Sequence, residues 1–130
     1  MQLRLIISVL ISTILIASAF WATSPKSGDT GITATSSVVT VNGTQVIDIT
    51  AKGGYEPRLI AAKANVPTVL RVKTSGTYDC SASLVIPKLS YQKFLEPTAI
   101  EEIQISAEKA TGTLQGLCSM GMYGFQIRFE

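Results

Sequence analysis

Sulfur-containing side chains close to the C-terminus are the residues of this sequence best suited to distinctive chemistry. Residues 118–124 read CSMGMYG, which places Cys118, Met120 and Met122 at alternate positions. The chain has three methionines and two cysteines, so both methionines other than Met1 fall in this one segment. Thiolate and thioether groups are soft ligands, and soft ligands select Cu(I). The pattern therefore predicts a site for monovalent copper, for which silver would be a chemical mimic.

Other metals and most side-chain catalysis fit this composition poorly. The chain contains no histidine, which excludes imidazole ligands, Ser–His and Cys–His nucleophile pairs, and the two-histidine site of a blue-copper protein. Zinc would be better served by histidine or by four cysteines. The nine acidic residues are too scattered to predict a calcium or magnesium site. We therefore expect a protein that binds a metal ion and is not an enzyme.

Two structural explanations compete with the copper site. Cys80 and Cys118 could form a disulfide, because two cysteines in a domain outside the cytoplasm commonly do so. Met120 and Met122 could fill gaps in a hydrophobic core, which is the usual role of a lone methionine. The joint spacing of one thiol and two thioethers favours the ligand interpretation over both alternatives.

The N-terminal segment predicts where the protein is located. Residues 5–22 carry no charge, and as a helix they would extend about 27 Å, nearly the hydrocarbon thickness of a bilayer. Phe20 and Trp21 favour a transmembrane anchor, because aromatic residues gather at membrane interfaces. An Ala-Ser-Ala sequence at 17–19 instead resembles the cleavage site of a signal peptide. Either arrangement places residues 23–130 outside the cytoplasm.

The remainder of the chain, after the segment 1–22, divides into a tether and one β domain. Residues 23–36 are small and polar with Gly and Pro, as in a flexible linker. In residues 37–130, short runs of alternating apolar residues are separated by turn signals, which predicts an all-β sandwich or barrel of about eight strands. Asn42-Gly43 lies between two such runs and predicts a β-hairpin. Residues 90–97 are expected to form a short helix or an irregular crossing.

Three segments together resemble the cupredoxin-like, plastocyanin-related domains of bacterial copper-handling proteins. They are GGYEPRLIAAKANVPTVLRVKT at 53–74, CSASLVIP at 80–87 and CSMGMYG at 118–124. The resemblance extends over about residues 45–130. It is closest to the membrane-anchored, CupA-type Cu(I) chaperones, and cupredoxin-like segments fused to copper-exporting ATPases are also similar. It implies a Greek-key β-sandwich, here preceded by one N-terminal hydrophobic helix.

The resemblance also implies a set of metal ligands. Cys80 falls where ordinary cupredoxins place their first histidine, Cys118 falls on their ligand cysteine, and two methionines, Met120 and Met122, fill the loop that follows. Such domains hold up to two Cu(I) ions, one bound by the thiolates and a second bound more softly by the methionines. Asp79, beside Cys80, is interpreted as a solvated residue or a turn residue rather than as a ligand.

The resulting hypothesis is a copper chaperone that works outside the cytoplasm. It would sequester Cu(I), exchange it with a copper-transporting P-type ATPase or the metal-binding domain of such a pump, and contribute to copper tolerance. Residues 5–22 would attach it to the cell membrane as a single-pass protein, unless signal cleavage releases a secreted or periplasmic form. Nucleic acid is not an expected partner, because the net charge is +2 and no basic run occurs. The alternatives are an electron-transfer cupredoxin and a structural sandwich with a Cys80–Cys118 disulfide.

Overall fold

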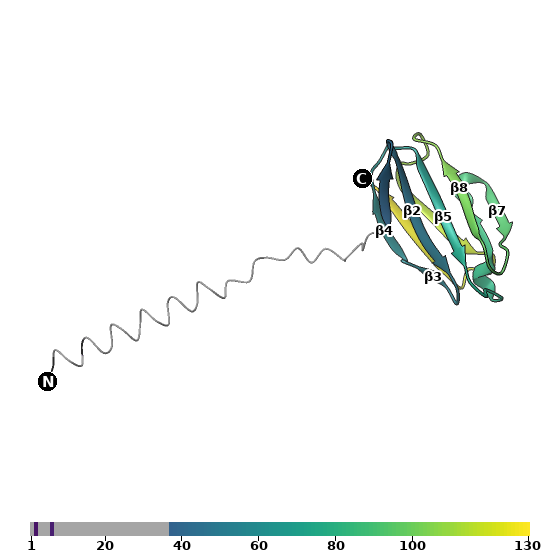
Figure 1. Ribbon diagram of the computed structural model, residues 1–130, viewed down its shortest axis with the longest axis horizontal. Coiled ribbons are helices and arrows are strands. Elements are labelled where there is room, and N and C mark those ends of the chain that lie inside the picture. The colour runs from purple at the N-terminus through teal and green to yellow at the C-terminus, as the bar shows by residue number, and fades with distance from the viewer. Residues whose placement is uncertain (1, 3–5, 7–36) are drawn as a thin grey trace. The chain divides into compact units, whose positions relative to one another are not determined.

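The computed structural model describes residues 2, 6 and 37–130 of the chain (Figure 1). The predicted anchor at 5–22 and the predicted tether at 23–36 lie outside the described residues, apart from Ile6. Within the part of the chain that is described, no helix has the length and apolar character needed to cross a membrane. The strands all belong to one compact unit, Ala34–Glu130.

Ten strands in the described residues form a Greek-key sandwich of two five-stranded sheets. The first sheet has the order β1-β2-β5-β8, with β3 paired to the other end of β2. Its strands are β1 (Val38–Val41), β2 (Thr44–Ala51), β3 (Tyr55–Glu56), β5 (Thr68–Thr74) and β8 (Ile100–Ile105). The second sheet has the order β4-β10-β9-β6-β7. Its strands are β4 (Leu59–Ala62), β10 (Gly124–Phe129), β9 (Gly112–Cys118), β6 (Ser83–Ile86) and β7 (Tyr91–Phe94).

The chain crosses between the two sheets several times, and this places distant segments side by side. After β3 it enters the second sheet at β4 and returns to the first sheet at β5. As a result β5 lies parallel to β2, and β10 lies parallel to β4, whereas the other paired strands are antiparallel. Figure 1 shows β2, β5 and β8 side by side in one layer.

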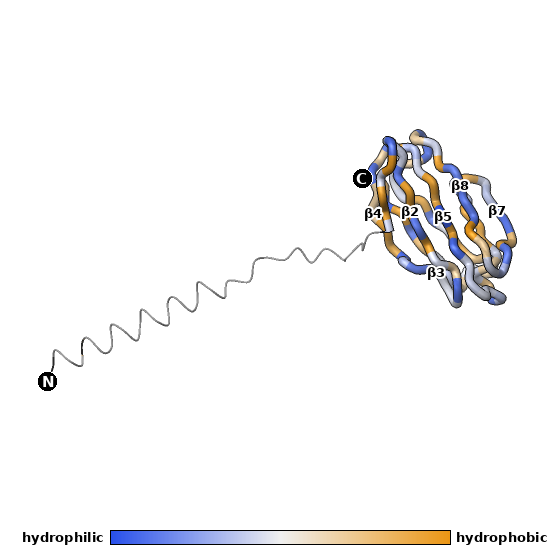
Figure 2. The backbone as a smooth tube through the Cα atoms, viewed as in Figure 1, coloured by the Kyte–Doolittle hydropathy of each residue, from blue (hydrophilic) through white to orange (hydrophobic). Residues whose placement is uncertain are grey.

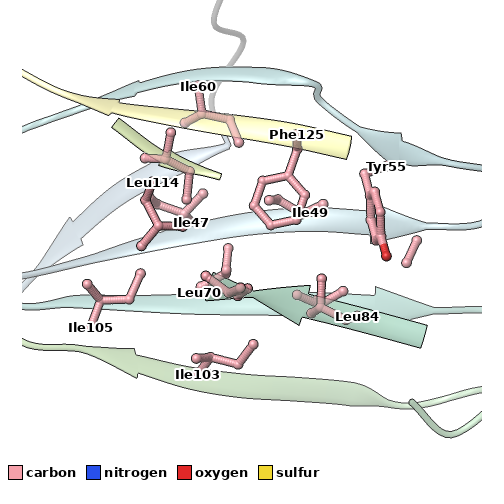
Figure 3. Close-up of a cluster of buried hydrophobic side chains, with 14 of the residues drawn as sticks. Ile47, Ile49, Tyr55, Ile60, Leu70, Leu84, Ile103, Ile105, Leu114 and Phe125 are labelled. Carbon is pink, nitrogen blue, oxygen red and sulfur yellow. The ribbon is translucent and has the colours of Figure 1, made fainter. Parts of the chain in front are cut away.

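Alternating burial along the strands explains why this sequence forms a sandwich. In β2, every second residue from Gln45 to Ala51 is buried, as expected for a strand with one face on a core. Figure 2 shows the same alternation of hydrophobic and hydrophilic residues along the tube. The inward faces of both sheets meet in one hydrophobic core, where Leu70 of the first sheet lies among Leu84 and Phe125 of the second (Figure 3).

The hairpin predicted at Asn42-Gly43 is confirmed. Val41 of β1 pairs with Thr44 of β2, so the turn between the two strands has two residues. Both turn residues have positive φ, 50° at Asn42 and 78° at Gly43. This is the backbone that a two-residue hairpin turn requires, and Asn and Gly adopt it most readily.

The short helix or irregular crossing predicted at 90–97 is wrong, because part of this segment forms the edge strand β7. β7 pairs with β6 in antiparallel register. Its Tyr91 hydroxyl and Lys93 ammonium group also donate hydrogen bonds to the carboxylate of Glu101 on β8. These contacts with two neighbouring strands hold a largely exposed segment in an extended conformation.

Residues 53–57 read GGYEP, a composition typical of a turn, but they also contain a strand, the two-residue β3. Tyr55 pairs with Ala51 and Glu56 pairs with Thr50, so the chain folds back on the end of β2. Together with β7, this strand raises the number of strands in the described residues to ten, against a prediction of about eight. The excursion matters for the site below, because it brings Gly53 and Tyr55 to the end of the sandwich where both cysteines lie.

Candidate metal centre

Cys80 and Cys118 lie together at one end of the sandwich, although they are distant in the sequence. Cys118 is the last residue of β9, pairs with Leu84 of β6, and is 1% exposed. Cys80 begins the short 3-10 helix η1 (Cys80–Ala82) and is half-buried. Both thiols are free, and they lie close enough for each to shift the pKa of the other. The structure thus brings together the two cysteines that the resemblance implies as copper ligands.

The two thiols have unlike electrostatic environments. The hydrogen bond to Cys118 and burial raise the pKa of Cys80, against the opposing effect of the Met120 backbone N–H. Burial also raises the pKa of Cys118, but the hydrogen bond from Cys80 and the backbone N–H groups of residues 120, 122 and 123 outweigh it and lower that pKa below its ordinary value. Cys118 is therefore the thiol whose ionised form the fold stabilises.

A tight loop of five residues, 119–123, wraps around the sulfur of Cys118. The backbone N–H of Cys118 donates to the carbonyl of Tyr123 at 2.9 Å, and the N–H of Gly121 donates to the carbonyl of Cys118 at 2.8 Å. In the opposite direction, the N–H of Tyr123 donates to the Cys118 sulfur at 3.4 Å. Gly121 has φ 71°, which explains why this loop contains a glycine between its methionines. The Tyr123 amide thus points at the sulfur, while the Tyr123 side chain packs against the core.

Met120 and Met122 are exposed on this loop. Their exposed fractions are 75% and 65%, so neither side chain fills the core. The alternative in which the methionines are core residues is therefore wrong. Both thioethers project from a loop whose amides contact the cysteine sulfurs, in a position where they can meet a metal ion or another molecule.

The turn that carries Cys80 is held by groups that include Asp79, as the sequence predicted for that residue. Asp79 accepts hydrogen bonds from the Ser81 backbone N–H at 2.8 Å and from the Gly53 backbone N–H at 2.9 Å. Hydrogen bonds from the side chain and backbone of Ser81 lower the pKa of this carboxyl below its ordinary value. Asp79 thus stabilises the turn as a helix cap, and its carboxylate is engaged with the backbone.

The sequence analysis did not predict a contribution by Tyr55 to this site. The Tyr55 hydroxyl is buried and donates to the carbonyl of Ser81 at 3.0 Å, next to Cys80. Burial is the main reason why the pKa of Tyr55 is raised well above its ordinary range, and the nearby Cys118, Cys80 and Asp79 add to the shift. A tyrosine directly after a Gly-Gly pair gives no sequence signal of a contact made 26 positions later.

The donors gathered here suit a soft metal ion. Among the described residues, no three His, Cys, Asp or Glu side chains cluster in a way that could hold a hard cation or zinc. Two free thiols at the same end of the sandwich, with two exposed thioethers on the adjoining loop, match the ligands that select Cu(I). The residues present therefore fit monovalent copper as a cargo ion.

Comparison with known proteins gives the same picture of the fold. The family model for the cupredoxin-like domain matches residues 12–127. No curated protein sequence matches the chain. Among solved structures, a copper-binding protein in its apo form is 26% identical with a TM-score of 0.64, and the match covers 72% of this chain and 94% of that one.

Two more distant structures share the fold. The metal-binding domain of the Cu(I)-exporting P-type ATPase CopA of Streptococcus pneumoniae D39, solved with Cu(I), is 18% identical with a TM-score of 0.64. That match covers 72% of this chain and 92% of the domain. Dithionite-reduced auracyanin from the photosynthetic bacterium Roseiflexus castenholzii is 13% identical with a TM-score of 0.50, covering 70% of this chain and 99% of that one. At these identities the similarity concerns the fold alone.

Proposed function

Because this chain belongs to the family of cupredoxin-like domains, we propose that it binds Cu(I) and hands it on outside the cytoplasm. The observation that carries the proposal is the pair of free thiols, Cys80 and Cys118, that lie near each other at one end of the sandwich. Copper is the cargo in this proposal, and the reaction is an exchange of ligands rather than catalysis.

The thiol pair supplies the tight site. Thiolates are charged and soft, so two of them bind Cu(I) more strongly than neutral thioethers do. Cys118 is buried and held by backbone amides, whereas Cys80 is half-buried on a turn at the surface. An incoming thiolate from a partner would therefore displace Cys80 first, while Cys118 still holds the ion.

Met120 and Met122 supply either a second, weaker binding site or a transient binding position for the ion during transfer. Both thioethers are largely exposed, on the loop whose amides contact the cysteine sulfurs. Ligands of graded strength lower the barrier to exchange, because the ion never has to leave all its ligands at once. Up to two Cu(I) ions per domain follow from this arrangement.

The partner we propose is a copper-transporting P-type ATPase or its metal-binding domain. The shared fold with the metal-binding domain of a Cu(I)-exporting ATPase supports a copper-transport setting for this chain. Residues 5–22 would place the domain beside such a pump by anchoring it in the cell membrane with the domain outside. Secretion after signal cleavage is the alternative location.

Two other functions make different predictions for the same residues. An electron-transfer cupredoxin needs two histidines beside its cysteine, and this chain has none. A structural sandwich would use Cys80 and Cys118 as a disulfide. Thiols joined in that way could not be alkylated without a reductant, whether or not copper is present.

The test is an anaerobic titration of the full-length chain, in detergent, with Cu(I) against a chromophoric chelator. We expect one ion to be held tightly and both cysteines to be protected from alkylation until the chelator removes it. Cys80→Ser and Cys118→Ser should each abolish tight binding, whereas the exposed Ser119→Ala in the same loop should leave it unchanged. Unaltered binding in both cysteine variants would refute the proposal.

A further inference from the structure

The two cysteines reach the site on supports of different kinds. Cys118 stands in a strand that is hydrogen-bonded on both sides, by β6 and by β10. Cys80 stands in an irregular segment, 75–82, between β5 and β6, whose only regular structure is the single turn η1. The position of the Cys118 sulfur is therefore set by the sheet. The position of the Cys80 sulfur depends on whatever fixes its turn.

The Leu95 backbone N–H donates to the Ala82 carbonyl at 2.7 Å, and two further tethers hold this turn from the loop before β3 and from β3 itself. In the first, the Gly53 backbone N–H donates to Asp79, whose carboxylate also caps the turn through Ser81. In the second, the Tyr55 hydroxyl donates to the carbonyl of Ser81 at 3.0 Å. These two tethers thus bind Asp79 and Ser81, the residues immediately before and after Cys80. Ser81 is fully buried, so its carbonyl has no access to water as an alternative partner.

Tyr55 is itself held in place from the strand that carries Cys118. Its ring lies edge-on against Phe125 of β10, with the ring centroids 5.2 Å apart and the planes at 70° (Figure 3). Phe125 lies opposite Gly116 in β9, where an added Cβ would come within 2.2 Å of its ring. Gly116 and Cys118 are two positions apart in one strand and face the same side of it.

We infer that Tyr55 is a positioning residue that sets where Cys80 lies relative to Cys118. Contacts run without a break from Gly116 through Phe125 and Tyr55 to the turn, so the strand bearing one ligand also locates the other. A pre-set pair of sulfurs binds an ion without first having to order a loop, and this raises affinity. The inference rests on the proposed function, because it concerns the same two thiols.

The experiment compares Tyr55→Phe with Tyr91→Phe in the reduced full-length chain. Each change removes one hydrogen-bonded hydroxyl, but Tyr91 donates to Glu101 at the β7–β8 edge and not to the turn. For each variant, the Cu(I) affinity, the free energy of unfolding, and the hydrogen exchange of the copper-free amides at Ser81 and Ala82 are measured. Asp79→Ala, which cuts the other tether at the surface, serves as a second variant if Tyr55→Phe fails to fold.

We expect Tyr55→Phe to lower Cu(I) affinity roughly threefold to tenfold, the equivalent of one lost hydrogen bond. It should also speed exchange at the turn, and Asp79→Ala should act in the same direction. Tyr91→Phe should lower stability at most and leave affinity and exchange at the turn unchanged. Equal effects of the two tyrosine variants on affinity and exchange would show that Tyr55 is only structural. If the wild-type chain binds no Cu(I), the proposed function fails, and the exchange measurement alone still decides whether Tyr55 holds the turn.

Discussion

Cys80 and Cys118 would share an ion from environments that differ in burial and in support. Cys118 is 1% exposed and receives a hydrogen bond from the Tyr123 amide, whereas Cys80 is half-buried beside a surface loop. At the scale of single residues this asymmetry suits a carrier. One ligand stays with the protein through each exchange, and the other can be replaced by a ligand of the partner.

The methionines provide a test of that view. We expect Met120→Leu combined with Met122→Leu to keep one tightly bound Cu(I), to lose any weaker second ion, and to pass copper more slowly to an acceptor domain. Both side chains are exposed, so the free energy of unfolding should change by no more than about 0.5 kcal/mol. Stoichiometry is measured by chelator competition, and transfer by mixing with a copper-free acceptor.

Substitution of other exposed apolar residues provides the control for the double methionine variant. Val39→Leu and Val41→Leu alter exposed side chains on the edge strand β1 and should leave binding and transfer as they are. If the double methionine variant also keeps its stoichiometry and transfer rate, the thioethers have no part in copper handling.

The sequence predicted the candidate ligands by type, but it did not predict what holds them. Cys118, Met120 and Met122 are recognisable because soft ligands are rare and here lie within one segment. The tethers from Gly53 and Tyr55 were not predictable, because each joins residues 26 positions apart through a backbone group. Any residue type has such a group, so the sequence carries no trace of the pairing.

At the scale of elements, the packing of β9 against β10 in the core helps to position the residues of the site. Gly116→Ala should destabilise the fold by about 1–3 kcal/mol, because the new methyl group would overlap the ring of Phe125. Chemical denaturation measures the effect. Gln115→Ala, one position earlier on the exposed face of the same strand, should cost far less.

A second substitution separates overlap from any effect on the glycine backbone. The double variant Gly116→Ala, Phe125→Leu replaces the ring by a smaller side chain. It should recover part of the lost stability if overlap with the ring is the cause. An equal or greater loss in the double variant would mean that Gly116 is needed for a reason other than the room it leaves.

The β7–β8 edge gives a prediction about pH. The hydrogen bond from Lys93 is the main cause that lowers the pKa of Glu101, with further help from Tyr91 and against the effect of burial. Since the folded pKa is depressed, the stabilisation is present above the ordinary glutamate pKa and is lost as the pH falls through the folded value.

Glu101→Gln should therefore be less stable than wild type at pH 7 by about 1 kcal/mol or less, as for a partly exposed ion pair. The difference should shrink as the pH drops below about 4.5. Denaturation curves at pH 7, 5 and 3 test this. Glu102→Gln, which removes the longer and more exposed ion pair with Arg71, should cost less stability at pH 7. A constant difference between Glu101→Gln and wild type at all three pH values would contradict the assignment.

The sequence predicted the class of elements better than their number. The hairpin at Asn42-Gly43 is encoded locally, because the turn needs positive φ and its neighbours alternate. β7 was missed because its four residues are largely exposed and owe their conformation to β6 and to Glu101. A strand that is stabilised mainly by contacts with neighbouring strands has little hydrophobic pattern of its own in the sequence.

At the scale of the whole molecule, the position of the chain relative to a membrane determines which partners it can meet. A carrier confined to the plane of a membrane encounters a pump at a high effective concentration, without new contacts to raise its affinity. The uncharged residues 5–22 carry this part of the proposal, and they can be tested independently of copper.

We expect the full-length protein to remain in the membrane pellet after an alkaline carbonate wash, with residues 37–130 accessible to external protease. Introducing Ile11→Arg and Ile14→Arg into the apolar run should release the protein, because each arginine near the middle of a spanning helix costs about 2.5–3.5 kcal/mol. Ser24→Arg, just beyond the run, is the matched control and should leave the protein in the pellet, because a cation beside a span stays in water. A soluble wild-type product that begins after Ala19 would show that the segment is a cleaved signal. Such a domain would have to find its pump by diffusion, and transfer would then depend on its concentration outside the cytoplasm.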